Sequence, residues 1–138
     1  MIRRIIAVLT VIAAMFLIGF TSYADEQPTL IKGFATAYIG DSDTTCTGDK
    51  VREGICGGCQ AYIGKTIILY QRLPGDKVGQ MLGIWECLDT GTGTEGFQQG
   101  RVIDVYKPTL EDCQRFMDLI YTNNAKGKVF IQVIESEG

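Results

Sequence analysis

Five segments of the chain have the pattern of β-strands, some through alternation of apolar and polar residues and others through their residue types. The alternation is clear in residues 33–40 and 101–106, where aromatic or aliphatic side chains exchange with small or polar ones. Residues 64–73 are rich in the β-branched and aromatic side chains that strands favour. The predicted strands are residues 33–40, 64–73, 81–89, 101–106 and 129–135.

Residues 107–120 change to the period of an amphipathic helix. Pro108 precedes the stretch, and Thr109 with Asp112 matches the capping box that opens many helices. The apolar residues at helical spacing are Leu110, Cys113, Phe116 (or Met117) and Ile120. One short helix is therefore expected before the last strand.

The remaining segments are rich in Gly, Asp, Thr, Asn and Pro, which favour turns and loops. We expect loops or turns at residues 41–58, 74–80, 90–100 and 121–128. Short strands that are joined by long crossing loops fit a small closed barrel.

The N-terminus has the pattern of a secretory signal peptide. Arg3 and Arg4 precede an uninterrupted apolar run, Ile5–Phe20, and small residues follow at Ser22 and Ala24. The run is short for a membrane span, which needs roughly 20 apolar residues. A cleaved signal is therefore favoured over a retained membrane anchor, and the membrane is a partner only if the segment is retained.

The chain of 138 residues then divides into a short export segment and one domain with a single core. The predicted boundaries are a signal peptide at 1–24, an N-terminal lead-in at 25–32 and a barrel domain at 33–138. The expected location of the mature protein is outside the cell.

Charge and composition exclude several functions. Loss of Arg3 and Arg4 lowers the basic residues from 13 to 11 against 16 acidic ones, which argues against nucleic acid as a partner. The sequence contains no His, which excludes Ser-His-Asp hydrolases, Cys-His proteases and the common zinc enzymes. Proton transfer would fall to Asp, Glu, Tyr, Lys or Cys, and we predict neither a metal nor a cofactor.

The cysteines are Cys46, Cys56, Cys59, Cys87 and Cys113. An oxidising compartment favours disulfides, and an odd number leaves one thiol unpaired. A disulfide or an unpaired thiol is the favoured interpretation, and a bridge from Cys46 would go to Cys56 or Cys59. A zinc site and a redox dithiol at "CGGC" are the alternatives, although the βαβ pattern that accompanies such a redox motif is absent.

Two aspartates occupy strand positions where apolar residues are expected. Asp89 ends an apolar run and would share a strand face with Cys87, while Asp104 would share a face with Val102 and Tyr106. Asp is disfavoured in strands, although Asp89 also fits a turn residue at a strand end. Two carboxylates brought close together raise the pKa of one, which can then act as a general acid.

Several motifs together resemble the three-aspartate (3D) domain family. They are "ATAY" (35–38), "IGKTIILY" (63–70), "DTG" (89–91), "GRVIDVY" (100–106) and "KVFIQVI" (128–134). The resemblance covers Phe34 to Ile134. It implies a mainly β fold, a small six-stranded double-psi β-barrel with one short helix before the last strand. Relatives include the catalytic barrel of membrane-bound lytic transglycosylase A and stationary-phase muralytic proteins.

The resemblance implies non-hydrolytic cleavage of peptidoglycan glycan strands between N-acetylmuramic acid and N-acetylglucosamine, in a secreted, cell-wall-associated protein. By motif position, Asp89 matches the catalytic acid, and Asp104 matches the buried carboxyl that hydrogen-bonds to it.

The resemblance and the residue types also give candidates for substrate binding. Thr90 and Gly91 would let the backbone approach the sugar, and Gly100 would let the loop adapt. Arg101 is a candidate partner for a carboxylate near the cleft, with a solvated surface charge as the alternative. Tyr38 is a candidate for stacking on a sugar, with a core position as the alternative.

The sequence departs from the family pattern at its first aspartate, which aligns near Gly57–Gly58. Asp41, Asp43 and Asp49 in the preceding loop are the residues that could substitute for it in space. Two alternatives to an enzyme follow from this difference. One is a catalytically inactive glycan-binding barrel similar to expansins and rare lipoprotein A, and the other is a non-enzymatic interaction protein.

Overall fold

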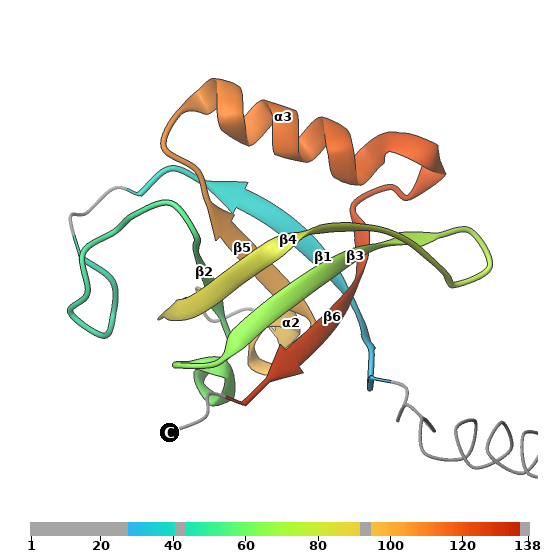
Figure 1. The fold of residues 1–138 in the computed structure, drawn as a ribbon. Coiled ribbons are helices and arrows are strands. Elements are labelled where there is room, and N and C mark those ends of the chain that lie inside the picture. The colour runs from blue at the N-terminus through green and yellow to red at the C-terminus, as the bar shows by residue number, and fades with distance from the viewer. Residues whose placement is uncertain (1–27, 41–43, 92–94, 136–138) are drawn as a thin grey trace, which may run out of the picture.

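The computed structural model describes residues 28–40, 44–91 and 95–135, which form a closed barrel of six strands (Figure 1). The strands are β1 (Ile31–Tyr38), β2 (Ile55–Gly58), β3 (Thr66–Leu73), β4 (Lys77–Thr90), β5 (Val102–Tyr106) and β6 (Lys128–Ile134). The helical elements are α2 (Glu95–Gln98), α3 (Leu110–Tyr121) and the 3-10 turns η1 (Gln60–Tyr62) and η2 (Thr122–Asn124). The predicted signal peptide, Asp41 and Asp43 lie outside the described residues.

The strand order around the barrel is β1-β5-β2-β4-β3-β6, which returns to β1. The pairs β1–β5 and β2–β4 are parallel, and the other four pairs are antiparallel. The predicted fold class is confirmed in that the structure is mainly β, with a closed barrel of six strands and a helix before the last one. Among the described residues, no helix combines the length and the apolar character that a membrane span requires.

The five predicted strands are confirmed, with their ends shifted by a few residues. The sixth strand, β2, lies inside the segment that was expected to be a loop, at residues 41–58. Two of its four residues are glycines, which carry no side-chain signal for a strand. The turn at 74–80 is shorter than predicted, because β4 already begins at Lys77, and the loop at 90–100 contains the helical turn α2.

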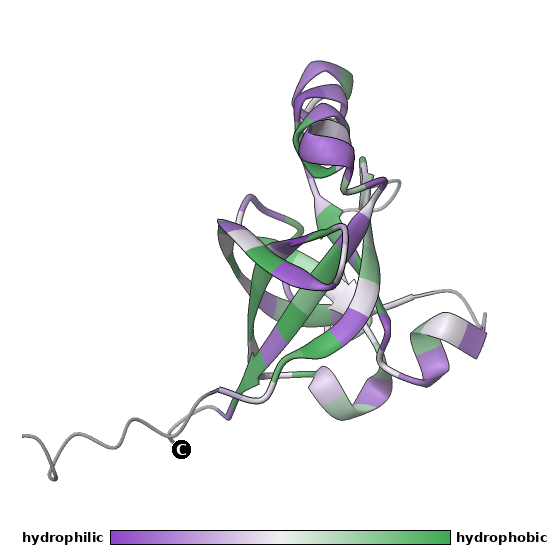
Figure 2. Cartoon of the chain, turned by 90° about the vertical axis from the view of Figure 1, so that its right-hand side faces the viewer, coloured by the Kyte–Doolittle hydropathy of each residue, from purple (hydrophilic) through white to green (hydrophobic). Residues whose placement is uncertain are grey.

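The inner faces of the strands form one apolar core. Ile67, Leu69, Ile103 and Val105 are fully buried in it, so the face of β5 that carries Asp104 points away from the core. Figure 2 shows hydrophobic and hydrophilic residues following one another along the strands, as expected when one face is buried and the other is solvated.

Helix α3 lies across one end of the barrel (Figure 1). Its residues Cys113, Phe116 and Ile120 are buried, as the helical period predicts. Leu110, the first residue of the helix, is 75% exposed, so its predicted core position is wrong, and the buried face begins one turn later. The capping prediction is confirmed, because Thr109 Oγ1 accepts a hydrogen bond of 3.1 Å from the backbone N–H of Asp112.

All five cysteines lie in the described part of the chain, and all five are unpaired, so the expected disulfide is absent. Cys56 and Cys87 are opposite each other in the β2–β4 pair and are fully buried in the core. The exposed Cys46 thiol lies 3.6 Å from the carbonyl oxygen of Leu88 and is bridged neither to Cys56 nor to Cys59. Within the described residues, no group of three or more His, Cys, Asp or Glu side chains is arranged to hold a metal ion.

Candidate functional site

A β-bulge in β4 determines where Asp89 points. Cys87 pairs with Cys56 of β2, but the next β2 residue, Gly57, pairs with Asp89, so Leu88 is the extra residue. The side chains of Cys56 and Cys87 face the core, and the bulge turns Asp89 to the opposite, outer face of the barrel. The prediction that Cys87 and Asp89 share a face is therefore wrong, because the bulge interrupts the alternation on which it rested.

The bulge brings the two aspartates into one row across the outer face. Asp104 of β5 pairs with Gly57 on one side and with Thr36 of β1 on the other. Asp89 pairs with the other edge of Gly57. The row is therefore Thr36, Asp104, Gly57, Asp89, and the glycine leaves space between the two carboxyl groups.

Asp104 is held by β1. Thr36 Oγ1 donates a hydrogen bond of 2.8 Å to Asp104 Oδ1. Burial raises the pKa of Asp104, the hydrogen bond from Thr36 opposes this, and the nearby charge of Asp89 raises the pKa further. Asp104 therefore keeps its proton to a higher pH than an exposed aspartic acid.

Asp89 is held by the loop that precedes β2. The backbone N–H groups of Cys46 and Thr90 donate hydrogen bonds of 3.1 and 3.0 Å to Asp89 Oδ1. The same loop is fixed to the bulge, because Thr47 Oγ1 donates a hydrogen bond of 3.2 Å to the carbonyl oxygen of Leu88. Both of these hydrogen bonds from backbone N–H groups are accepted by Oδ1.

Tyr38 lies near both Asp89 and Asp104. Its hydroxyl oxygen is buried and makes no hydrogen bond with the described residues, although its ring packs edge-on against Tyr106 with the ring centres 5.8 Å apart. Burial raises the pKa of Tyr38, and the charges of Asp89 and Asp104 raise it further, so the hydroxyl stays protonated. A buried donor without a partner costs free energy, and a ligand that accepts its hydrogen bond would recover that cost.

The other predicted binding residues lie around Asp89, Asp104 and Tyr38 rather than among them. Thr90 and Gly91 line a cavity of about 460 Å³ that also contains Gly58, Cys59 and Phe97, and Asp89 is not part of its lining. Gly91 packs against the Phe97 ring, where any side chain would overlap that ring.

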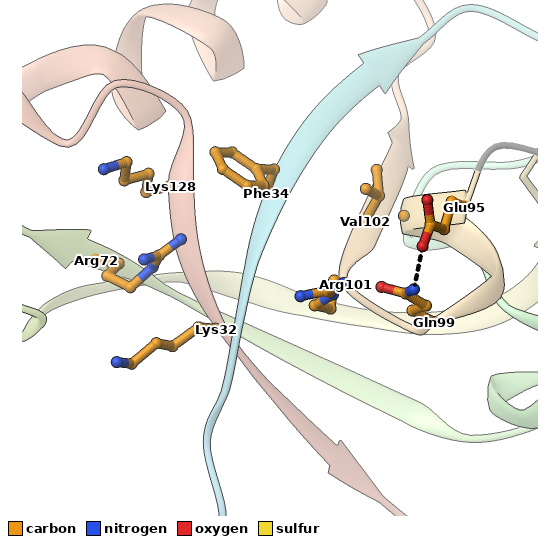
Figure 3. Close-up of a pocket in the computed structure, with 9 residues that line it drawn as sticks. Lys32, Phe34, Arg72, Glu95, Gln99, Arg101, Val102 and Lys128 are labelled. Carbon is orange, nitrogen blue, oxygen red and sulfur yellow. Dashed lines mark hydrogen bonds between the residues drawn. The ribbon is translucent and has the colours of Figure 1, made fainter.

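Gly100 and Arg101 lie farther along the same loop. The Tyr62 hydroxyl donates a hydrogen bond of 2.9 Å to the Gly100 carbonyl oxygen, and Gly100 has a φ of 71°, so this glycine is required by local packing. Arg101 lines a separate cavity with Lys32, Phe34 and Arg72 (Figure 3).

Gly57 lies in the segment, near Gly57–Gly58, where the resemblance to the three-aspartate family would place a first aspartate. A Cβ atom at Gly57 would meet only ordinary contacts, the nearest being the Asp89 carbonyl oxygen at 3.6 Å. The barrel therefore accepts a side chain between the two carboxyl groups, and the missing carboxylate is a difference in chemistry and not in fold.

This geometry predicts that Gly57→Ala keeps or raises stability, by up to about 1 kcal/mol, because alanine loses less backbone entropy on folding. The matched control is Gly33→Ala, whose Cβ would overlap the Arg101 carbonyl oxygen. We expect that variant to lose about 1–3 kcal/mol. Urea unfolding of both variants gives the comparison, and a larger loss for Gly57→Ala than for Gly33→Ala would contradict this account of the row.

Some residues of the site carried no signal in the sequence. Thr36 and the backbone of Cys46 belong to the site because strand pairing and the course of the loop bring them within hydrogen-bonding distance of Asp104 and Asp89. No protein-family model matches this chain, and no curated protein matches it in sequence, so its chemistry rests on the residues of the site itself.

Proposed function

We propose that this chain is an exported lytic-transglycosylase-like enzyme that cleaves the glycan strands of peptidoglycan at the cell wall. The observation that carries the proposal is the placement of Asp89 and Asp104 on either side of Gly57, with the Tyr38 hydroxyl directed to the same group. The resemblance to the three-aspartate domain family supplies the substrate class.

In this proposal, Asp89 is the general acid and then the general base. Its proton goes to the glycosidic oxygen as the bond to the N-acetylmuramic acid carbon breaks. The resulting carboxylate removes the proton from the 6-hydroxyl of the same sugar, whose oxygen closes the 1,6-anhydro ring. No water is activated, so the second catalytic carboxylate of an ordinary glycosidase is not needed.

Asp104 acts on this chemistry through Asp89. Thr36 fixes its orientation. Because its pKa is raised, Asp104 keeps its proton to a higher pH than an exposed aspartic acid, which widens the pH range over which Asp89 has an uncharged neighbour. Asp104 is therefore a positioning residue. The raised pKa of Tyr38 keeps its buried hydroxyl neutral beside the two carboxyl groups.

The proposal is tested by digestion of purified peptidoglycan with the purified full chain and mass spectrometry of the soluble products. Lytic transglycosylation predicts fragments that end in 1,6-anhydromuramic acid and are lighter by one water than the hydrolysis products. Fragments with a free reducing end, and none with an anhydro end, would overturn the proposed reaction.

Gly57 favours a second candidate function, a glycan-binding barrel without catalysis, because one carboxylate of the family pattern is missing. Intact peptidoglycan that retains bound protein after the same digestion would select this candidate. Absence of both binding and cleavage would exclude both candidates and leave the non-enzymatic interaction protein.

A further inference from the structure

A cavity of about 490 Å³ on the outside of the barrel collects positive charge from four elements of the chain. The basic residues in its lining are Lys32, Arg72, Arg101 and Lys128. Phe34 lies among them and is 47% exposed. In the view of Figure 3, Lys32, Arg72 and Lys128 lie on one side of β1, and Arg101 lies on the other side. We call this cavity the cationic pocket.

Acidic residues do not neutralise the cationic pocket. Glu95 is the one acid in the lining, and its carboxylate accepts a hydrogen bond of 2.7 Å from Gln99 (Figure 3). Asp76 pairs with both Lys32, at 2.7 Å, and Arg72, at 3.4 Å. Arg101 and Lys128 form no ion pair with the described residues, so the pocket keeps positive charge in a chain whose net charge is −3.

Arg72 is fixed in place before any ligand arrives. Its guanidinium group donates hydrogen bonds of 3.0 Å to the Gly33 carbonyl oxygen and 3.2 Å to the Val129 carbonyl oxygen. It also packs over the rings of Phe34 and Phe130, at 5.6 and 6.0 Å from their centres. Because only 10% of the side chain is exposed, little conformational entropy remains to be lost when an anion binds.

The cationic pocket lies next to the row of aspartates along β1 and β5. Phe34 pairs with Val102, and the next outward-facing pair along the same strands is Thr36 with Asp104. Two residues of a strand span about 6.6 Å, so the pocket begins about that distance from Asp104. A polymer bound along β1 and β5 would therefore place one part at the aspartates and another part at the basic side chains.

We propose that the cationic pocket binds the carboxylate groups of the acidic peptides that the glycan polymer carries. The identity of the polymer rests on the proposed function, whereas the capacity of the pocket for carboxylates rests on its own charges. Arginine and lysine donate charge-assisted hydrogen bonds to carboxylates, and the exposed face of Phe34 offers an apolar contact to peptide side chains. The pocket thereby selects glycan strands with free peptide carboxylates over amidated or peptide-free strands.

The test is calorimetric titration of the purified full chain, made inactive by Asp89→Asn, with three soluble probes. These are a muramyl disaccharide-peptide with free carboxylates, the same compound with amidated carboxylates, and the acidic peptide without sugar. We expect the free carboxylates to raise affinity about tenfold over the amidated compound, the effect of one charge-assisted hydrogen bond. We also expect the free peptide to bind more weakly than the disaccharide-peptide, because it lacks the sugar that occupies the aspartate row.

Arg101→Gln with Lys128→Gln is expected to reduce that preference to about twofold or less, since these two basic residues of the lining form no ion pair within the described part of the chain. Lys50→Gln with Lys77→Gln is the matched control, because it removes two exposed lysines outside the pocket lining and should keep the preference. Equal affinity for the free and amidated compounds, or a preference that survives in the pocket variant, would overturn the proposal.

The outcomes for the pocket and for catalysis are separate. A tenfold preference in a protein that releases no anhydro fragments would support the pocket and reject the proposed reaction. Release of anhydro fragments without any preference for free carboxylates would support the proposed reaction and reject the pocket.

Discussion

Asp89→Asn is expected to lower the rate of peptidoglycan cleavage by roughly 10²–10⁴-fold, the range that a single general acid contributes. Asparagine keeps the shape of the side chain, and its oxygen can still accept hydrogen bonds from the backbone N–H groups of Cys46 and Thr90. It carries no proton that it can give to a glycosidic oxygen. The release of anhydro fragments per minute, measured beside thermal unfolding, separates lost chemistry from lost folding.

Asp104→Asn is the matched control for this prediction. Because burial raises the pKa of Asp104 in the folded barrel, its contribution to stability is largest at low pH and is lost as the pH rises through that pKa. The variant should therefore be at least as stable as the original protein near neutral pH, and it should lose less activity than Asp89→Asn. Full activity in Asp89→Asn, or a larger loss in Asp104→Asn, would reverse the roles of the two residues.

Trp85→Ala is expected to lower the free energy of unfolding by about 3–5 kcal/mol, which is typical of a large buried aromatic side chain. Trp85 is 6% exposed and packs edge-on against Phe116 of α3, with the ring centres 5.8 Å apart. Gly83 leaves room for the indole ring, because a Cβ atom at that position would lie 2.7 Å from it. The substitution would therefore loosen the contact between the helix and the barrel as well as open a cavity.

Chemical denaturation monitored by circular dichroism measures this loss. Ile84→Ala is the matched control, because Ile84 is the preceding residue of β4 and is 56% exposed. Its expected effect is within about 0.5 kcal/mol, as for most surface substitutions. Equal losses in the two variants would show that α3 does not depend on Trp85.

Most of the fold could be predicted from the sequence because its core is regular. Val102 to Tyr106 alternate strictly, and their buried residues are the ones that the period of two identifies. The capping residue Thr109 likewise acts locally, within one helical turn. Such short-range signals depend on side chains that lie close together in the chain.

The parts that could not be predicted depend on pairing between distant segments. Strand β2 contains Gly57 and Gly58, and it is a strand because β4 and β5 flank it. The bulge at Leu88 has no signal in the residue itself, yet it decides that Asp89 faces outward. The basic residues of the cationic pocket come from β1, β3, β6 and the position just before β5, and only barrel closure brings them together.

The candidate site was predicted in part for the same reason. Asp89, Asp104 and Tyr38 were recognised as candidates by residue type and position, and the structure brings these three together. Gly100 and Arg101 are close to Asp104 in sequence, but one lies under Tyr62 and the other lines the cationic pocket. Residues that are close in sequence therefore need not belong to the same site.

The position of β1 in the barrel has a consequence for how the chain folds. Its partners in the sheet are β5 and β6, which lie at the other end of the described sequence. Strand β1 can therefore pair only after β5 and β6 are in place, and contacts between residues so far apart in sequence slow folding. Loss of residues 128–134 would leave both β1 and β3 with an unpaired edge, since β6 joins them. A chain that ends before β6 would consequently expose two strand edges to other chains, and its expected fate is aggregation.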